Sequence, residues 1–354
     1  MNITEVFTPA AVAAYWTEVG SNRIAYLGEG LFPAQKKAGL DLNWFKGSRG
    51  LPVSLMPSAF DAKATFRDRI GVQKVETEMP FFREGFKLKE KDRQELLRAQ
   101  SSADPYAREV LDRIFRDAAD LIEGAAVVPE RMRMQLLFPE NGNVGISIVA
   151  NGVNYTYNYD PDGSWRLANY TVLTSGDKWD APSTADPVKT LDTARNNLRS
   201  LYGAESNVAI MNQATFDKMC ACNAMKQRAF PGVNVANVYI TGAEARRVLQ
   251  DSIGVTVTVY DKMFKDESKI THKFVPDGYV ALVPARAIGG TYYGTTPEEA
   301  DLMDSAIADV QIVNTGVAIT REIQPHPVNV NTFASEIVLP SFEAMDECAC
   351  IKVY

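Results

Sequence analysis

The first fifty residues contain too little regularly spaced apolar sequence to form a core of their own. Thr8 followed by Pro9 is typical of a helix start, and an apolar stripe follows at Val12, Tyr15, Trp16 and Val19. A stretch punctuated by glycines runs from residue 20 to residue 50, and its clearest pattern is the strand-like alternation of residues 40–44. Because such an arm cannot bury itself, it must pack on the body of its own chain or on a neighbour.

A second unusual segment, residues 60–79, is predicted to form two charged strands around Gly71. One face of the first strand carries Lys63, Arg67 and Arg69, and Asp68 breaks the alternation. The return strand places its charged residues on one face, at Lys74, Glu76 and Glu78. An isolated hairpin is marginal in water. Two interpretations therefore stay open: a solvated surface hairpin, or an extended arm whose charges meet complementary charges on another subunit.

The rest of the chain mixes helix and strand patterns. Apolar residues recur at helical spacing over residues 106–122, and Pro129 is expected to start a further piece, which together predict a long, interrupted helix. Asn151-Gly152 predicts a tight hairpin within residues 146–159. Further helices are expected at 187–201, 213–225 and 244–252, and strands at 207–211, 255–260, 274–284 and over most of 310–353. Without a regular strand–helix–strand rhythm, the fold class is α+β rather than α/β.

Charge and hydropathy narrow the classes of function. The 354-residue chain carries a formal net charge of −7, so it is a poor candidate for wrapping nucleic acid by neutralising phosphates. It can still line a container that holds nucleic acid. No apolar run approaches the eighteen or so residues that a membrane-spanning helix needs, and the start of the chain lacks the pattern of a secretory signal. We therefore expect no membrane partner.

Residues that carry chemistry are few. The four cysteines form two Cys-Ala-Cys pairs, Cys220/Cys222 and Cys348/Cys350, whose spacing is tighter than that of most structural zinc sites; small buried residues are the favoured interpretation. The two histidines stand alone, and no phosphate-binding loop, nucleophile elbow or His-Glu-x-x-His motif occurs. The acidic run Glu298-Glu299 fits the first turn of a helix. We expect no enzyme, no catalytic residue, no metal and no cofactor.

One region resembles a known family. The sequence Phe-Val-Pro-Asp-Gly-Tyr-Val-Ala-Leu-Val-Pro at 274–284, followed by Ile-Gly at 288–289 and Tyr-Gly-Thr-Thr-Pro-Glu-Glu at 293–299, resembles the lambda-like major capsid protein E family of tailed bacteriophages. Shorter segments agree in order: Phe-Arg-Asp-Arg at 66–69, Arg-Met-Arg-Met at 131–134 and Val-Leu-Pro-Ser-Phe at 338–342. The resemblance covers nearly the whole chain.

The resemblance implies the Hong Kong 97-type capsid fold. It implies an N-terminal arm at 1–45, an extended loop at 46–87, a peripheral domain with a spine helix at 88–186, an axial domain at 187–310, return strands at 311–342 and a C-terminal axial strand at 343–354. Subunit contacts are expected from the extended loop, through Lys63, Arg67, Asp68, Arg69, Lys74, Glu76 and Glu78. The arm is expected to contribute further contacts, through Tyr15, Trp16, Trp44 and Phe45.

The implied function is that of a major capsid protein. Its copies would form hexamers and pentamers of an icosahedral shell around double-stranded DNA, contacted non-specifically, within a virion assembled in bacterial cytoplasm. A scaffolding protein, a portal and a decoration protein are the implied partners. Lys63 and Lys74 are available for isopeptide bonds of the kind some relatives form, but no partner asparagine is evident, so reinforcement by a decoration protein is expected. A protein-cargo compartment of the same fold and an unrecognised enzyme are the alternatives.

Overall fold

The computed structural model describes residues 8–20, 25–46, 73–88, 90–91, 94, 106–150, 152–235, 238–303, 308–325 and 328–354. The chain folds as two compact units, each built from three separate segments. The first unit comprises Met1–Leu42, Glu76–Arg131 and Gly290–Ser341, and the second comprises Asn43–Val75, Met132–Gly289 and Phe342–Tyr354. The domain boundaries expected from the resemblance divide the chain at other positions than these units do, and they stay predictions.

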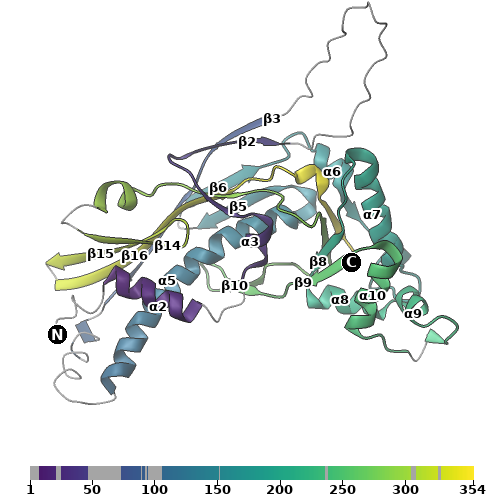
Figure 1. Ribbon diagram of the computed structural model, residues 1–354, viewed down its shortest axis with the longest axis horizontal. Coiled ribbons are helices and arrows are strands. Elements are labelled where there is room, and N and C mark those ends of the chain that lie inside the picture. The colour runs from purple at the N-terminus through teal and green to yellow at the C-terminus, as the bar shows by residue number, and fades with distance from the viewer. Residues whose placement is uncertain are drawn as a thin grey trace, which may run out of the picture. The chain divides into compact units, whose positions relative to one another are not determined.

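A six-stranded sheet organises the first unit (Figure 1). Its central strand, β16 (Val328–Pro340), pairs antiparallel with β15 (Val317–Pro325), β4 (Phe81–Lys87) and β13 (Thr291–Tyr293). The strands β14 (Asp309–Val313) and β1 (Ala34–Lys36) complete it, and β1 is the parallel member, alongside β13. Segments from both ends of the chain therefore meet in one sheet.

The arm helix of the first unit packs on this sheet. Helix α2 (Pro9–Gly20) begins as predicted, with the Thr8 hydroxyl oxygen accepting from the Ala11 N–H at 3.2 Å. Its Val12 is buried in a small apolar cluster with Leu88, which follows β4, and with residues of α5 (Tyr106–Leu137) and of the sheet: Ala118, Ile122, Val313, Val317, Ile319 and Ala334. The short helix α3 (Leu27–Leu31) follows, and its Gly28 N–H donates to the buried Glu130 carboxylate at 3.0 Å.

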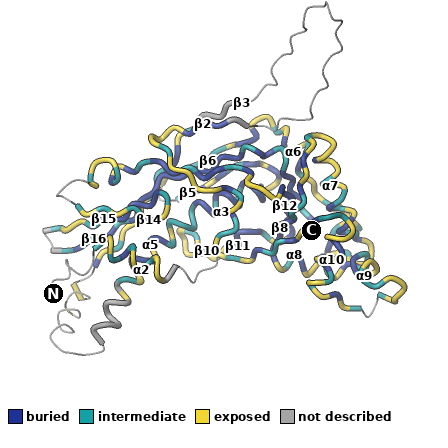
Figure 2. Tube along the Cα trace, viewed as in Figure 1, coloured by how far each residue is buried: buried dark blue, intermediate teal, exposed yellow. Residues whose placement is uncertain are grey.

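A five-stranded mixed sheet organises the second unit. The strand order is β7 (Tyr170–Val172), β17 (Ala349–Lys352), β12 (Tyr279–Val283), β8 (Val208–Met211) and β9 (Thr256–Val259). Every residue of β12 is buried, and Figure 2 shows dark blue along β8 and β12 in contrast to the exposed outer turns of the helices. The helices α7 (Pro187–Tyr202), α8 (Gln213–Ala221), α9 (Asn223–Ala229) and α10 (Gly242–Ile253) share its apolar core.

The remaining elements of the second unit are short. Two hairpins, β5 (Gly145–Ala150) with β6 (Val153–Asn158) and β10 (Met263–Lys265) with β11 (Thr271–Lys273), are each two-stranded. The small helix α6 (Ser164–Asn169) precedes β7. Single helical turns lie at η1 (Glu140–Gly142), η2 (Ser175–Asp177) and η5 (Met345–Glu347). In the first unit, η4 (Glu298–Leu302) is a turn of π-helix.

Two sequence-based expectations about helices were wrong. The spine is one helix, α5, with Pro129 inside it rather than at an interruption. Pro129 has no N–H to donate to the Ala125 carbonyl, yet the helix continues through it, and Ile122 before it and Met132 after it are both buried. The helix expected at 213–225 is instead broken at Cys222, whose backbone is extended. The next N–H, that of Asn223, donates to the Pro182 carbonyl at 2.8 Å, and this distant contact redirects the chain.

Candidate assembly surfaces

The residues expected in the extended loop fall mostly outside the described residues. Lys63, Arg67, Asp68 and Arg69 lie in the segment 47–72, which the structure does not describe. The return strand is confirmed as β3 (Gln73–Glu78), and it pairs with β2 (Asp41–Lys46), the strand expected at 40–44. Of the side chains on β3 only Thr77 and the exposed Glu78 are described, so Lys74 and Glu76 are placed by backbone alone. Their role at an interface stays a prediction.

Three of the four aromatic residues expected at an arm interface have partners within their own chain. The ring of Tyr15 lies 5.7 Å from that of Phe115, and Trp16 packs against the cluster around Val12. Trp44 is buried, with its ring 5.4 Å from that of Tyr159. The side chain of Phe45 lies outside the described residues. The described contacts thus give Tyr15, Trp16 and Trp44 a packing role inside the subunit, and contact with a neighbour stays a prediction for all four.

Two ion pairs join distant segments of the first unit. The Arg83 guanidinium on β4 pairs with the buried carboxylate of Glu298, and the Lys36 ammonium on β1 pairs with Glu299. Lys36 also donates to the Gly294 carbonyl at 3.1 Å. The acidic run was interpreted from sequence as a helix start, and η4 is indeed helical. Its two glutamates also form ion pairs with residues of β4 and β1. Sequence reasoning missed Lys36 and Arg83, because partners more than 200 positions apart leave no local pattern.

The Phe-x-Pro-Asp-Gly segment has a structural explanation in the second unit. The Asp277 carboxylate accepts from the side-chain amide of Asn212, the residue that caps α8, and from the Lys273 ammonium at 2.8 Å. The ion pair with Lys273 is the main cause that holds the pKa of Asp277 below its usual value. The Gly278 N–H donates to the Thr215 hydroxyl at 2.9 Å. The motif therefore connects the turn before β12 to the start of α8.

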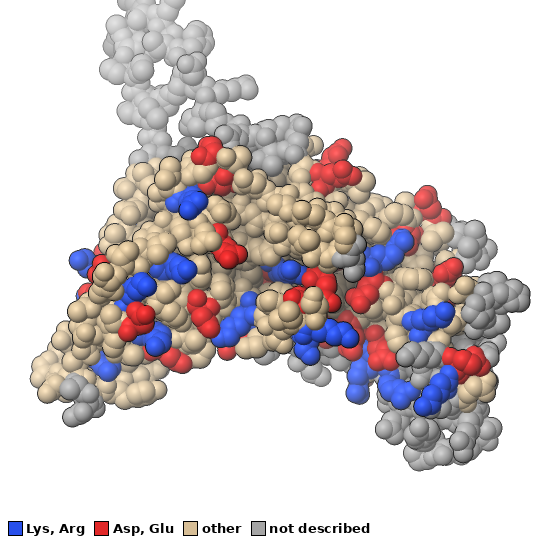
Figure 3. Space-filling view, turned by 180° about the vertical axis from the view of Figure 1, so that it is seen from behind, with Lys and Arg blue, Asp and Glu red and all other residues tan. Residues whose placement is uncertain are grey.

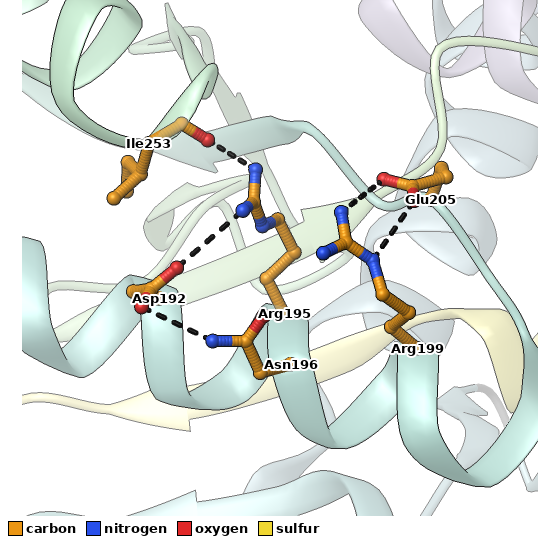
Figure 4. A network of polar contacts seen from close by, with 6 residues as sticks. All are labelled: Asp192, Arg195, Asn196, Arg199, Glu205 and Ile253. Carbon is orange, nitrogen blue, oxygen red and sulfur yellow. Dashed lines mark hydrogen bonds and ion pairs between the residues drawn. The ribbon is translucent and has the colours of Figure 1, made fainter.

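The surface charges of α7 are largely matched within the chain. Figure 4 shows the Arg195 guanidinium between the Asp192 carboxylate and the Ile253 carbonyl at the end of α10. One turn later, Arg199 makes two hydrogen bonds of 2.9 Å with Glu205. That pairing lowers the pKa of the exposed Glu205 carboxyl. On the face drawn in Figure 3, basic and acidic side chains are interspersed over the described residues, without a large area of one sign.

The histidine and cysteine side chains that the structure describes are paired locally or at least partly buried. His272 lies 2.8 Å from Asp266 within its own hairpin, and His326 is outside the described residues. Burial raises the pKa of the Cys220 thiol to about 11 and that of Cys222 to about 12. Among the described residues, no three His, Cys, Asp or Glu side chains gather where they could hold a metal ion. Within the same residues, no helix has the length and apolar character to cross a membrane.

Three solved structures of phage-related or capsid proteins are similar in fold. A phage-related protein from Bordetella bronchiseptica RB50 matches with a TM-score of 0.53 at 14% identity, covering 96% of each chain. The capsid asymmetric unit of cyanophage A-1(L) matches with a TM-score of 0.54 at 12% identity, covering 93% of this chain and 92% of the other. The putative capsid protein of an Escherichia coli CFT073 prophage matches with a TM-score of 0.52 at 13% identity, covering 80% and 81%.

These likenesses show the Hong Kong 97-type fold of phage capsid proteins, with its mixed helices and sheets, as expected from the sequence. A comparison with curated proteins found no match. The family model described as phage major capsid protein E matches residues 8–353, which is almost the entire chain. The chain therefore belongs to the phage major capsid protein E family and is a shell protein of a tailed phage.

Proposed function

We propose that copies of this chain assemble as hexamers and pentamers into a closed icosahedral shell that encloses double-stranded DNA. The observation that carries the proposal is the family match over residues 8–353, together with the capsid fold. Assembly into a closed shell is physically reasonable, because every subunit of such a shell binds several neighbours at once. Contacts that are weak singly then hold firmly together.

The shell has partners other than itself. A scaffolding protein, a portal and a decoration protein complete the particle, which is assembled in the cytoplasm of a bacterial host and found in the virion. DNA is contacted without sequence specificity, and the net charge of −7 keeps most of the wall from gripping it. The subunit acts as structural material, without catalysis and without a cofactor.

The interface of the proposed shell uses the extended loop and the arm. Lys63, Arg67, Asp68, Arg69, Lys74, Glu76 and Glu78 contribute charges that meet complementary charges on a neighbour. The aromatic residues of the arm extend the contact where their faces are left open by the packing inside the subunit. Charged contacts of this kind are specific and adjustable, so they suit a shell that rearranges during maturation.

The test is electron microscopy of the purified chain, expressed alone and together with its scaffold. We expect closed particles of a single size. A chain that stays monomeric at high concentration, with and without scaffold, would contradict the proposal. The contents of particles from infected cells separate the alternative: packaged DNA supports a phage shell, whereas a packaged enzyme would point to a cargo compartment.

Reinforcement of the shell is proposed to come from a decoration protein rather than from bonds between subunits. When mature particles are dissolved in denaturant and run on a denaturing gel, the shell subunit should therefore run at the mass of the monomer, 39.0 kDa, apart from the bands of the other proteins. A ladder of covalent oligomers would overturn this part of the proposal and direct attention to Lys63 and Lys74.

A further inference from the structure

Strand β4 pairs with one neighbour only among the described strands. Its partner is β16, in a register where Pro80 lies opposite Val338 and Leu88 opposite Val330. The Val338 N–H donates to the Pro80 carbonyl, and the Leu88 N–H donates to the Val330 carbonyl. In an antiparallel pair, alternate residues point their N–H and C=O toward the partner. Even-numbered residues of β4 therefore face β16, and odd-numbered residues face away from it.

The outward positions include Arg83, Gly85 and Lys87. Each offers one backbone N–H and one C=O on the side away from β16, and none of these groups has a partner among the described residues. All three residues are exposed. A row of unpaired groups on a strand of seven residues is a template on which another extended segment can pair.

The side chains along this edge favour an acidic segment. The Phe333 ring lies over Gly85, where an added Cβ would come within 2.5 Å of it, so no side chain obstructs the middle of the edge. On either side of Gly85 and on the same face stand two cations, Arg83 and Lys87. The Arg83 side chain stays 47% exposed despite its ion pair with Glu298. The chain has 44 Asp and Glu residues against 37 Lys and Arg residues, so a second copy offers more carboxylates than cations as partners for this edge.

Two β4 strands are poorly suited to pair with each other. An antiparallel pair centred on Glu84 would set that carboxylate against its own copy, and one centred on Gly85 would set Arg83 against Lys87. Like charges directly opposite each other destabilise a strand pair. These two registers are therefore disfavoured, and the proposed partner of β4 is a different part of the second copy. Such a head-to-tail contact is the kind that closes into rings, which suits hexamers and pentamers.

We propose that the outward edge of β4 receives an extended, acidic segment of a second copy of this chain, which adds a strand to the six-stranded sheet. The inference rests on the proposed shell function and specifies one of its contacts. Carboxylates of the added strand meet Arg83 and Lys87, while its backbone pairs with the outward groups at Arg83, Gly85 and Lys87.

Hydrogen exchange tests this contact, because it separates the even-numbered amides of β4, which face β16, from the odd-numbered amides, which face away. Free subunits and assembled shells are pulsed in deuterated water, quenched, dissociated and read residue by residue by mass spectrometry. The inward amides of Glu84 and Phe86 should be protected in both states. The outward amides of Gly85 and Lys87 should exchange quickly in free subunits and at least tenfold more slowly in shells. Equal exchange of the outward amides in both states would overturn the inference while leaving the shell itself intact.

A proline substitution provides the second test. Lys87→Pro removes an outward N–H that makes no bond to any described residue of the subunit, and proline is tolerated on such edges. Lys87→Ala is the matched control, because it removes the charge but keeps the N–H. We expect both variants to fold, with a thermal midpoint near that of the natural chain. The yield of shells from Lys87→Pro should fall at least fivefold below that from Lys87→Ala.

The outcomes separate the two proposals. Equal yields from the proline and alanine variants, with both folded, would contradict strand addition at β4. Absence of shells from the natural chain would instead contradict the proposed function. If Lys87→Pro does not fold, the exchange experiment on the unmodified chain decides alone.

Discussion

Gly278 illustrates how one residue fixes the local backbone. Its φ is +80°, in the left-handed region that favours glycine, and an added Cβ would lie 2.9 Å from the carbonyl oxygen of Tyr354. The Gly278 carbonyl also accepts from the Val353 N–H at 2.7 Å. The Pro-Asp-Gly turn is thus pressed against the chain that continues from β17, the neighbour of β12 in the sheet. This packing explains why a motif without reactive chemistry is specific in sequence.

We predict that Gly278→Ala lowers the free energy of unfolding by about 2–4 kcal/mol, from backbone strain and from the clash with Tyr354. Gly163→Ala is the matched control, because Gly163 has a φ of +70° but open space around it. For that variant the free energy of unfolding should fall only by the contribution of backbone strain, about 1–2 kcal/mol. Urea unfolding of both variants measures the difference. Equal losses would show that contact with Tyr354 contributes nothing.

The Asp266 carboxylate makes the turn of the β10–β11 hairpin depend on pH. It accepts from the N–H groups of Ser268 and Ile270 and lies 2.8 Å from His272 Nε2. The hydrogen bond from His272 is the first cause of the lowered pKa of Asp266. A carboxyl whose pKa is lowered by folding stabilises the folded state above its ordinary pKa, near 4, and that contribution is lost as the pH falls further.

We therefore predict that the amides of Ser268 and Ile270 lose protection from hydrogen exchange as the pH falls from about 5 to about 3, beyond the change in intrinsic exchange rate. Asp266→Asn should abolish the pH dependence, because an amide does not titrate. The amides of β12 serve as the internal reference. If the variant keeps the same pH profile, a different group controls the turn.

At the level of elements, local chemistry accounts for the successful predictions. Helix α7 starts at Asp186, whose carboxylate accepts from the Lys189 N–H at 3.1 Å, and ends at Gly203 in the left-handed conformation. Asn151-Gly152 correctly predicted the hairpin of β5 and β6, in which Ala150 lies opposite Val153. Caps and tight turns depend on a few neighbouring residues, so the sequence shows them directly.

The elements that escaped prediction depend on distant contacts. Helix α6 was not expected between residues 160 and 186. It forms because the Asp160 carboxylate accepts from the N–H groups of Trp165 and Arg166 and because the buried Trp165 ring donates to the Met345 carbonyl, 180 positions away. The break at Cys222 has the same kind of cause, in Pro182. Patterns of apolar spacing carry no information about such contacts.

For α7 we predict that Asp186→Ala lowers the free energy of unfolding by about 1–2 kcal/mol. It removes the cap and a partly exposed ion pair with Arg228. Glu205→Ala is the control, since it removes an exposed ion pair with Arg199 but no cap, and its loss should stay within about 0.5 kcal/mol. Urea unfolding followed by circular dichroism compares them. Equal losses would mean that the cap contributes nothing measurable.

At the scale of the whole molecule, the resemblance predicted the family and the fold, whereas the local patterns alone reached only a mixed α+β class. Of the candidate assembly surfaces, the sequence predicted the charged loop but not the ion pairs between distant segments. The pairing of Arg83 with Glu298 and of Lys36 with Glu299 was not predictable, because it depends on which segments the sheet brings together. The charged loop was evident from sequence, but its central residues lie outside the described part of the chain.

The charged loop leads to a prediction about assembly. The double variant Arg67→Glu and Arg69→Glu should fold as a subunit but give at least tenfold fewer shells, because the reversed charges face like charges on the neighbour. The control, Arg67→Lys with Arg69→Lys, keeps the charge and should assemble. Sedimentation measures the yield of particles, and circular dichroism checks folding. Normal shells from the double reversal would mean that the loop is a solvated surface feature.

The position of β17 in the five-stranded sheet has a consequence for synthesis of the protein. This strand comes after every other strand of the sheet in the chain, yet it lies between β7 and β12 rather than at a margin. During synthesis, β7 and β12 therefore lack the strand that pairs with both of them until residues 349–352 have left the ribosome. A product of interrupted translation lacks that strand and cannot complete the five-stranded sheet.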